Sequence, residues 1–267
     1  MLTQEQINQF HRDGYLRGSR VITDEQIETL RAELQRVIAD DGKPNVPQPV
    51  LLRNLNANNP DAATVWQIVN IWEASQPYRN LLIENRQIAE EMGQLTRASQ
   101  LRIWHDQIQY KPPKVGGTTM WHQDAPLWPI IRPMTEVSAW VALDDVDEEN
   151  GCMRMVPGSH LWGDNMNWIR NNVPTWDGMP GEFDGHKIEI RACPVRKGEV
   201  HFHHALTWHG SPDNKSERPR RALAIHYMTQ DTQYVSSGNH PMKDFVEVGD
   251  GEMMRGDHFP LVWERQY

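Results

Sequence analysis

The sequence predicts a mainly β fold with flanking helices, built around a double-stranded β-helix, the jelly-roll (cupin-like) barrel. Two observations carry this prediction. Apolar residues recur at helical spacing in the first hundred residues, and from Leu101 onward they alternate with period two. Many short strands that follow a block of helices are typical of two facing antiparallel sheets. A chain of 267 residues suits one domain, and we expect residues 1–267 to form one.

Composition narrows the class of protein. Hydrophobic residues make up 38% and charged residues 24%, as in an ordinary globular chain. No apolar run approaches the ~18 residues that a membrane helix needs, and the first residues lack the basic-then-apolar pattern of a signal peptide, so we expect a cytoplasmic location. The net charge of −9 disfavours nucleic acid and anionic membranes as partners. Cys152 and Cys193 are expected to be unpaired thiols.

The first part of the chain, residues 1–100, is predicted to be a mainly helical buttress. Thr3 and Thr23 each stand three positions before a Gln, which is the capping-box pattern of a helix start. The first of these helices is expected to stop near Gly14. Beyond the two helices we expect a loop over residues 41–60 and further helix over residues 61–96.

Residues 101–230 are predicted to form the jelly-roll core. Prolines and glycines separate short segments of alternating pattern, as between the strands of an antiparallel sheet. A long segment rich in Trp, Gly and Pro, residues 160–186, interrupts this rhythm, and we expect this insertion to act as a lid. Strands are expected over residues 101–110, 136–143, 152–156, 199–204 and 221–228, with one more around His122.

A His-x-Asp motif lies within this core. His122 and Asp124 are two positions apart, so on a strand their side chains leave the same face. An imidazole and a carboxylate on one face supply two donors of the facial 2-His-1-carboxylate triad, which binds Fe(II) and leaves coordination positions open. The third donor must come from a distant strand, and His209 is a candidate.

Neighbouring histidines compete with His209 for the third position. His201 and His203 would share one face of a strand and look like a metal pair of the cupin type. That type also needs a Glu, and no suitably spaced Glu follows His203. We therefore expect His203 and His204 to be supporting polar residues near the mouth of the barrel.

Four motifs in order carry a resemblance to a known family. They are His-Gln-Asp at 122–124, Asn-Gly-Cys-Met-Arg-Met-Val-Pro-Gly-Ser-His at 150–160, His-Gly-Ser-Pro-Asp-Asn at 209–214 and Arg-Pro-Arg-Arg-Ala at 218–222. From Trp104 to Met228 the chain resembles the phytanoyl-CoA dioxygenase family of non-haem iron, 2-oxoglutarate-dependent oxygenases. The resemblance implies Fe(II), 2-oxoglutarate and O2 as cofactor and co-substrates. It also implies an iron triad of His122, Asp124 and His209.

Arg220 has a physical reason to bind 2-oxoglutarate. This dianion chelates iron through its keto-acid end and must bury its far carboxylate, which the fork of an Arg binds bidentately. One guanidinium balances the charges of Fe(II), an Asp ligand and the dianion, and an unbalanced buried charge is costly. Arg218 and Arg221 are rivals, but Arg221 would face the other side of the strand, and the resemblance places the anchor at Arg220. Ser211 is expected to donate a second hydrogen bond to this carboxylate.

Further binding residues follow from the resemblance and from parity. The resemblance implies that Trp140 lies beside 2-oxoglutarate and that Gln107 lines the same pocket. Gln123 points away from the metal by strand parity, but its backbone is expected to line the site.

Several tryptophans are candidates for substrate contacts. Trp128 follows the His-x-Asp motif closely, and Trp162, Trp168 and Trp176 lie in the insertion. As an aromatic lid they would press a ring-bearing or apolar substrate toward the metal and exclude water.

The sequence thus predicts an enzyme, a non-haem Fe(II)/2-oxoglutarate-dependent oxygenase that forms a monomer or homodimer. The expected reaction is hydroxylation of a C–H bond of a small organic molecule, with decarboxylation of 2-oxoglutarate to succinate and CO2. Desaturation or cyclisation would use the same ligands, and a non-catalytic, metal-stabilised binding or sensor protein is the alternative from another class. Asp124 argues against halogenation, because related iron halogenases have a small residue there and bind chloride instead.

Overall fold

The computed structural model describes residues 1–54, 65–114 and 116–266. A main sheet has the strand order β1-β12-β7-β14-β4-β3-β2, with β16 paired to β4, and a small sheet has the order β11-β8-β13-β5. The main-sheet strands are β1 (Tyr15–Arg20), β2 (Leu51–Asn54), β3 (Trp66–Val69), β4 (Gln100–Lys111), β7 (Val137–Ala142), β12 (Glu199–His204), β14 (Arg220–Thr229) and β16 (Leu261–Glu264). The small sheet consists of β5 (Thr119–His122), β8 (Met153–Met155), β11 (Arg191–Cys193) and β13 (His209–Ser211).

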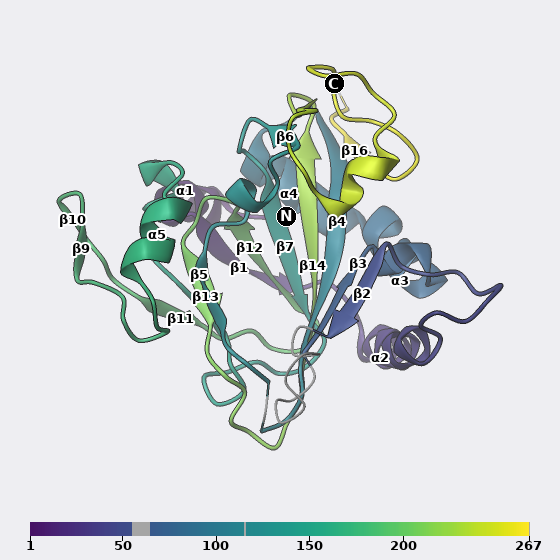
Figure 1. The fold of residues 1–267 in the computed structure, drawn as a ribbon, viewed down its shortest axis with the longest axis horizontal. Helices are drawn as coiled ribbons and strands as arrows, with labels where there is room; N and C mark the ends of the chain where they lie inside the picture. Colours follow the sequence, from purple (N-terminus) through teal and green to yellow (C-terminus); the bar gives the residue numbers. More distant parts are fainter. Residues whose placement is uncertain (55–64, 115, 267) are drawn as a thin grey trace.

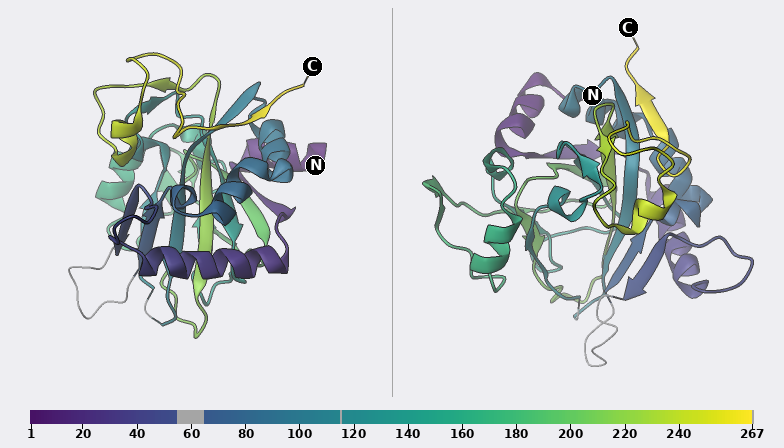
Figure 2. Two further views of the ribbon diagram at one scale, coloured as in Figure 1. Left: turned by 90° about the vertical axis from the view of Figure 1, so that its right-hand side faces the viewer. Right: turned by 45° about the horizontal axis from the view of Figure 1, so that its top comes forward.

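Helices cover one face of the main sheet. They are α1 (Gln4–Asp13), α2 (Asp24–Ala39), α3 (Gln76–Glu84) and α4 (Arg86–Thr96), while α5 (Met166–Asn172) belongs to the insertion. In Figure 1 the small sheet lies on the other side of the main sheet from α2 and α3, and Figure 2 shows α2 running across the main sheet. The order of layers is therefore helices, main sheet, small sheet and, outermost, α5. The predicted jelly-roll with flanking helices is confirmed.

The predicted starts of the first two helices are correct. Thr3 caps α1 by accepting a hydrogen bond from the backbone N–H of Gln6, and the Gln6 side chain accepts one from the Thr3 backbone in return. Thr23 caps α2 with the same reciprocal pair. Gly14 ends α1 at a φ of 81°, a left-handed conformation that glycine adopts without strain.

Alternation along the strands decides which side chains meet the helices and which face the small sheet. On β14, Leu223 and Ile225 join the core beneath the helices. Ala222 and Ala224 join a second core between the sheets. These inner side chains are small, so the space between the sheets remains available to the larger polar residues described below.

The N-terminal hundred residues contribute more to the sheet than the predicted helical buttress. Strand β1 pairs with β12, and β2 and β3 extend the main sheet beyond β4. Part of the helix expected over residues 61–96 is therefore strand β3, because its residues hydrogen-bond to the exposed edge of β4, a tertiary partner that helical spacing does not reveal. The expected loop over residues 41–60 contains β2, and residues 55–64 lie outside the described residues.

Short elements complete the chain. Among the residues described, no helix is long and apolar enough to span a membrane. Two small ribbons pair β6 (Ile131–Arg132) with β15 (Gln233–Tyr234) and β9 (Glu182–Phe183) with β10 (His186–Lys187), and short 3-10 turns occupy η1 (Ile71–Glu73), η2 (Ala125–Leu127), η3 (Ser159–Trp162) and η4 (Pro241–Phe245).

Candidate iron and 2-oxoglutarate site

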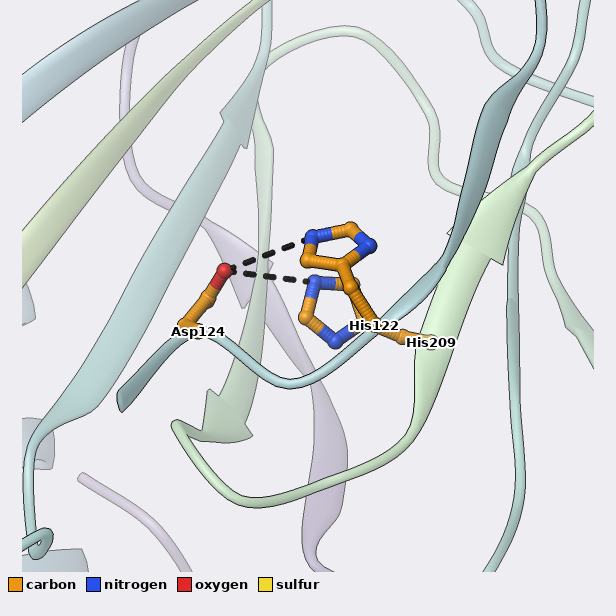
Figure 3. A group of neighbouring side chains, drawn as sticks. All are labelled: His122, Asp124 and His209. Atoms are coloured by element: carbon orange, nitrogen blue, oxygen red, sulfur yellow. Dashed lines mark ion pairs between the residues drawn. The ribbon is translucent and has the colours of Figure 1, made fainter. Parts of the chain in front are cut away.

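His122, Asp124 and His209 meet between the two sheets. Nε2 of His122 lies 3.4 Å from Oδ1 of Asp124. Nε2 of His209 lies 3.7 Å from the same oxygen. One ligand atom from each residue falls within 4.8 Å of the others, which a single metal ion would bridge. Figure 3 shows the two imidazoles lying one above the other and facing the carboxylate from the same side.

Strand pairing brings the two imidazoles together. β13 pairs antiparallel with β5, and His209 is the direct partner of His122 in that register. Asp124 follows the end of β5, and its backbone N–H donates to the carbonyl of Ala205 at 2.8 Å. The i, i+2 spacing thus places Asp124 beside His122 as predicted, although the strand ends before Asp124.

Backbone carbonyls fix the tautomer of both imidazoles. Nδ1 of His122 lies 2.7 Å from the carbonyl of Met120. Nδ1 of His209 lies 2.9 Å from the carbonyl of Thr207. A carbonyl only accepts, so each Nδ1 carries the proton and each Nε2 offers its lone pair toward Asp124, the arrangement that a metal ligand needs.

The charge states of the three groups suit a metal. Burial and the neighbouring His122 lower the pKa of His209 to about 3, which keeps its imidazole neutral at pH 7. Burial alone would raise the pKa of Asp124, but the imidazoles of His209, His122 and His203 outweigh this and hold it well below its usual range. Burial opposes the charged form of His122, but the bond to Asp124 and its charge outweigh burial and raise the pKa of His122, so a metal ion would displace a proton from that imidazole. Two imidazole nitrogens and one carboxylate, with open positions, form a donor set that fits Fe(II).

The competing histidines lie elsewhere. His203 contacts the far oxygen of Asp124, with Nε2 at 3.3 Å from Oδ2. His201 stacks on the ring of Tyr15, with centroids 5.6 Å apart. His204 accepts a hydrogen bond from the backbone N–H of Leu206. The geometry therefore favours His209 as the third donor and makes His203 a neighbour of the donor set.

A cavity of about 280 Å³ opens beside the histidine and carboxylate donors. Its walls carry amide, aromatic and cationic side chains from β3, β4 and β14. The residues that matter below are His122, Asp124, Gln67, Gln107, Gln109, Tyr110, Lys111, Trp66, Trp128, Arg220 and His226.

Arg220 brings an uncompensated positive charge into this cavity. Its side chain is 1% exposed, and Nε and Nη2 have no hydrogen-bond partner among the described residues. Its carbon Cζ lies 4.9 Å from the ring centre of Trp140, so the indole face supports the guanidinium. Burial lowers the pKa of Arg220 to about 10, and the group stays cationic at pH 7. A buried guanidinium with two free donors calls for an anion.

The rival arginines already have carboxylate partners. Arg218 lies 2.6 Å from Asp147 at the surface. Arg221 faces the opposite side of β14, as parity predicts, and contacts Asp144 through Nε at 2.8 Å and Nη2 at 2.7 Å. Arg220 alone of these three has free N–H groups in the cavity.

Lys111 is a residue that the sequence argument missed. Its buried Nζ donates to Oγ of Ser211 at 2.6 Å, to the Ser211 carbonyl at 3.1 Å and to the Pro212 carbonyl at 2.7 Å. Because Oγ of Ser211 accepts from Lys111, its own proton is free for another acceptor, which is compatible with the expected bond to a carboxylate. Lys111 lies four positions after Gln107 on β4, so strand parity places both side chains on the same face, and this was the available signal.

The remaining predicted cofactor residues divide into two groups. Gln107 lines the cavity, and Trp140 lies beneath Arg220. The side chain of Gln123 lies elsewhere: its Nε2 donates to the carbonyls of Gly163 and Leu206 at 2.8 Å each. Gln123 therefore ties the insertion to the core, in agreement with the side-chain direction that strand parity predicts, and the expected place of its backbone in the cofactor site stays a prediction.

The tryptophans also divide into two groups, and three of them lie away from the cavity. Trp128 lines the cavity. Trp162 and Trp168 instead pack against Trp208, and Trp176 stacks on Trp121 with centroids 5.0 Å apart. Trp121 and Trp208 directly precede the two histidine donors, so they face the outer side of the small sheet. The insertion thus covers that outer side, and its three tryptophans pack on the small sheet instead of lining the cavity, where the expected lid would have placed them.

This placement leads to a stability prediction. Trp208 is fully buried beneath Trp162, Trp168 and Phe183. Trp208→Ala is expected to lower the free energy of unfolding by about 3–5 kcal/mol, because the lost indole leaves a cavity that the small sheet cannot fill. Urea denaturation would measure the change. A loss below about 1 kcal/mol would show that the cluster is not a core, since that is the size of an ordinary surface substitution.

His226 is a second cavity residue that the sequence argument missed. Its Nδ1 lies 2.6 Å from Oγ of Ser138. Its ring contacts Trp128 at 4.7 Å and His105 at 4.6 Å between centroids. Clamped in this way, the imidazole presents a fixed polar edge in the same cavity as the proposed iron donors. His226 lies an even number of positions after Arg220 on β14, so strand parity could have predicted that both side chains face the cavity.

Comparisons with known proteins agree with this geometry. A family model described as Phytanoyl-CoA dioxygenase (PhyH) matches residues 10–222. The peroxisomal phytanoyl-CoA dioxygenase of Mus musculus is 27% identical, over 94% of this chain and 76% of the mouse protein. The non-heme alpha ketoglutarate dependent carbocyclase SnoK from nogalamycin biosynthesis has a TM-score of 0.78 at 26% identity, covering 98% of this chain and 97% of its own. The epimerase SnoN, solved with Fe3+, alpha ketoglutarate and nogalamycin RO, has a TM-score of 0.73 at 25% identity, covering 97% and 98%.

Fold, donor set and relatives together define the class of protein as a non-haem Fe(II)/2-oxoglutarate-dependent oxygenase. Within that class, the chain belongs to the phytanoyl-CoA dioxygenase family. The predicted enzyme class and its cofactor and co-substrates, Fe(II), 2-oxoglutarate and O2, are thereby confirmed.

Proposed function

We propose that this oxygenase hydroxylates a C–H bond of a small, uncharged, ring-bearing molecule. In this proposal His122, Asp124 and His209 hold the iron, and Arg220 binds the far carboxylate of 2-oxoglutarate. The observation that carries it is the buried guanidinium of Arg220, whose Nε and Nη2 find no partner among the described residues, in the cavity that His122 and Asp124 also line. A binding or sensor protein has no use for a buried cation beside a metal site.

Iron and 2-oxoglutarate, when bound, would supply the oxidising chemistry together with O2: one oxygen atom of O2 would enter succinate as CO2 leaves, and the other would enter the hydroxylated substrate. The chain's own residues bind and orient. The carbonyls of Met120 and Thr207 hold the imidazoles in their metal-binding tautomer. Trp140 supports Arg220 from below, which fixes the direction from which a carboxylate is held.

The cavity supports an uncharged substrate. Apart from Asp124 and Arg220, the charged group among its described lining residues is Lys111, whose three donated bonds go to Ser211 and Pro212. A substrate that carried a charge would find no partner for it there. The rest of the described lining combines the amides of Gln67, Gln107 and Gln109 with the ring of Trp128. Rings and hydroxyl or carbonyl groups match these surfaces.

The experiment that tests this proposal is a panel of neutral ring-bearing molecules, scored for substrate-dependent succinate release under O2. Charged analogues of each ring, amines and carboxylates, form the matched controls. Mass spectrometry then separates the outcomes. Hydroxylation adds one oxygen atom, desaturation or cyclisation removes two hydrogens, and epimerisation leaves the mass unchanged. The structural relatives named carbocyclase and epimerase make the last two outcomes the direct rivals. Succinate release with charged analogues alone would contradict the proposed substrate class.

Chloride should not enter the product. Asp124 supplies a carboxylate where a halide would otherwise bind, so product formed in chloride buffer is expected to contain no chlorine. The measurement is the isotope pattern of the product after turnover in chloride and in acetate buffer. A chlorinated product would remove Asp124 from the proposed ligand set.

A further inference from the structure

His203 contacts the oxygen of the Asp124 carboxylate that lies farther from the two proposed histidine ligands. Oδ1 of Asp124 lies nearest Nε2 of both His122 and His209, at 3.4 and 3.7 Å. Oδ2 lies 3.3 Å from Nε2 of His203. The two oxygens of this carboxylate therefore have different surroundings, one toward the metal position and one toward strand β12.

The direction of this hydrogen bond follows from the charge of Asp124. An ionised carboxylate accepts only, so Nε2 of His203 carries the proton and donates it to Oδ2. Nδ1 of His203 has no partner among the described residues, and the ring is buried against His209, with centroids 4.8 Å apart. The contact with Asp124 is thus the polar interaction that the His203 side chain makes in the described part of the chain.

We propose that His203 is a positioning residue that keeps Asp124 a one-oxygen ligand. This inference rests on the iron ligands proposed above. A carboxylate binds a metal through one oxygen or through both, and three protein donors leave three positions of an octahedral ion open only in the first case. 2-Oxoglutarate needs two of these positions and O2 needs another. By holding Oδ2, His203 preserves the room that both co-substrates require.

His203 is not placed as a fourth ligand. The ligand atoms of His122, Asp124 and His209 lie within 4.8 Å of one another, and that group does not include His203. Its Nε2 faces the opposite oxygen of Asp124. His201, two positions earlier on the same face of β12, provides a matched control. It is equally buried, with ring centroids 6.0 Å from those of His203, but both of its nitrogens lack partners among the described residues.

Four variants test the proposal: His203→Phe, His203→Asn, His203→Gln and the control His201→Phe. The readouts are anaerobic Fe(II) affinity and the visible band that forms when 2-oxoglutarate chelates the iron. The amide nitrogen of Gln reaches about as far as Nε2 of His, whereas that of Asn reaches only as far as Nδ1. Phe and Asn are therefore expected to weaken Fe(II) binding about tenfold or more and to diminish the 2-oxoglutarate band. Gln and the His201 control are expected to match the wild type within about twofold.

The Gln and Asn pair keeps the test independent of folding, because both are polar amides. Equal Fe(II) affinity and an equal band in the Phe and Asn variants would overturn the proposal. A Gln variant as impaired as Asn would also overturn it, since ring shape and not the hydrogen bond would then matter. If the wild-type protein itself formed no band, the proposed iron ligands would fail, a result distinct from failure of the role of His203.

Discussion

Replacing His209 by alanine is expected to abolish the visible band that Fe(II) and 2-oxoglutarate give together under anaerobic conditions. His209 supplies one of three donors, and its partner in the β13–β5 register is His122. Without it, Asp124 and His122 form a site with two donors, which no longer holds the ion against water. His122→Ala is expected to have the same effect. The measurement is a titration of the apo protein with Fe(II) at saturating 2-oxoglutarate.

The neighbouring histidines supply the contrast for this experiment. His203 touches Asp124 but is not among the proposed donors, so His203→Gln is expected to retain the band. A band that survives His209→Ala and disappears in His203→Ala would move the third ligand to His203. Thermal unfolding of each variant separates loss of metal from loss of fold.

Arg220→Ala is expected to raise the dissociation constant for 2-oxoglutarate at least tenfold, while Fe(II) still binds. The buried guanidinium has two nitrogens without partners in the part of the chain that the structure describes, and the far carboxylate of 2-oxoglutarate is the anion proposed to accept their hydrogen bonds. Removing one member of a buried charge pair typically costs ~3–5 kcal/mol, and water that enters the vacated space reduces this. Titrating the iron-loaded protein with 2-oxoglutarate, and following the same visible band, gives the constant directly.

Arg218 is the matched control for Arg220. It lies two positions earlier and is engaged with Asp147 at the surface, so Arg218→Ala should leave 2-oxoglutarate affinity unchanged. Arg220→Lys is expected to restore only part of the affinity, because an ammonium group lacks the planar fork. Normal 2-oxoglutarate affinity in Arg220→Ala, together with weak 2-oxoglutarate binding in Arg218→Ala, would show that Arg218 is the anchor and Arg220 is not.

Local rules explain what the sequence predicts well. The capping boxes at Thr3 and Thr23 depend on four consecutive residues, and both helices begin there. The pairing of His122 with Asp124 depends on a spacing of two. The proposed metal donors can therefore be predicted from the local spacing of His122 and Asp124 and from the choice of one distant residue, His209.

Features that depend on a tertiary partner are harder to read. Strand β3 forms by pairing with the edge of β4. The ammonium group of Lys111 finds its hydrogen-bond acceptors only in the folded chain, where Ser211 and Pro212 approach it. The composition of the insertion predicts a lid over the metal site, whereas strand parity indicates that the insertion covers the outer side of the small sheet. Trp121 and Trp208 adjoin the histidine donors and so must point away from the metal, toward the insertion's own tryptophans.

The direct pairing of His122 with His209 has a consequence for how the protein acquires its metal. These residues become neighbours only when β13 has paired with β5, a contact between parts of the chain that are far apart in sequence. A nascent chain that ends before residue 209 has no complete site, whatever the iron supply. A slip of one residue in the β13 register would also turn His209 outward and Trp208 inward. The complete donor set therefore requires this pairing, and an iron ion that binds it would stabilise the register of the small sheet that forms it.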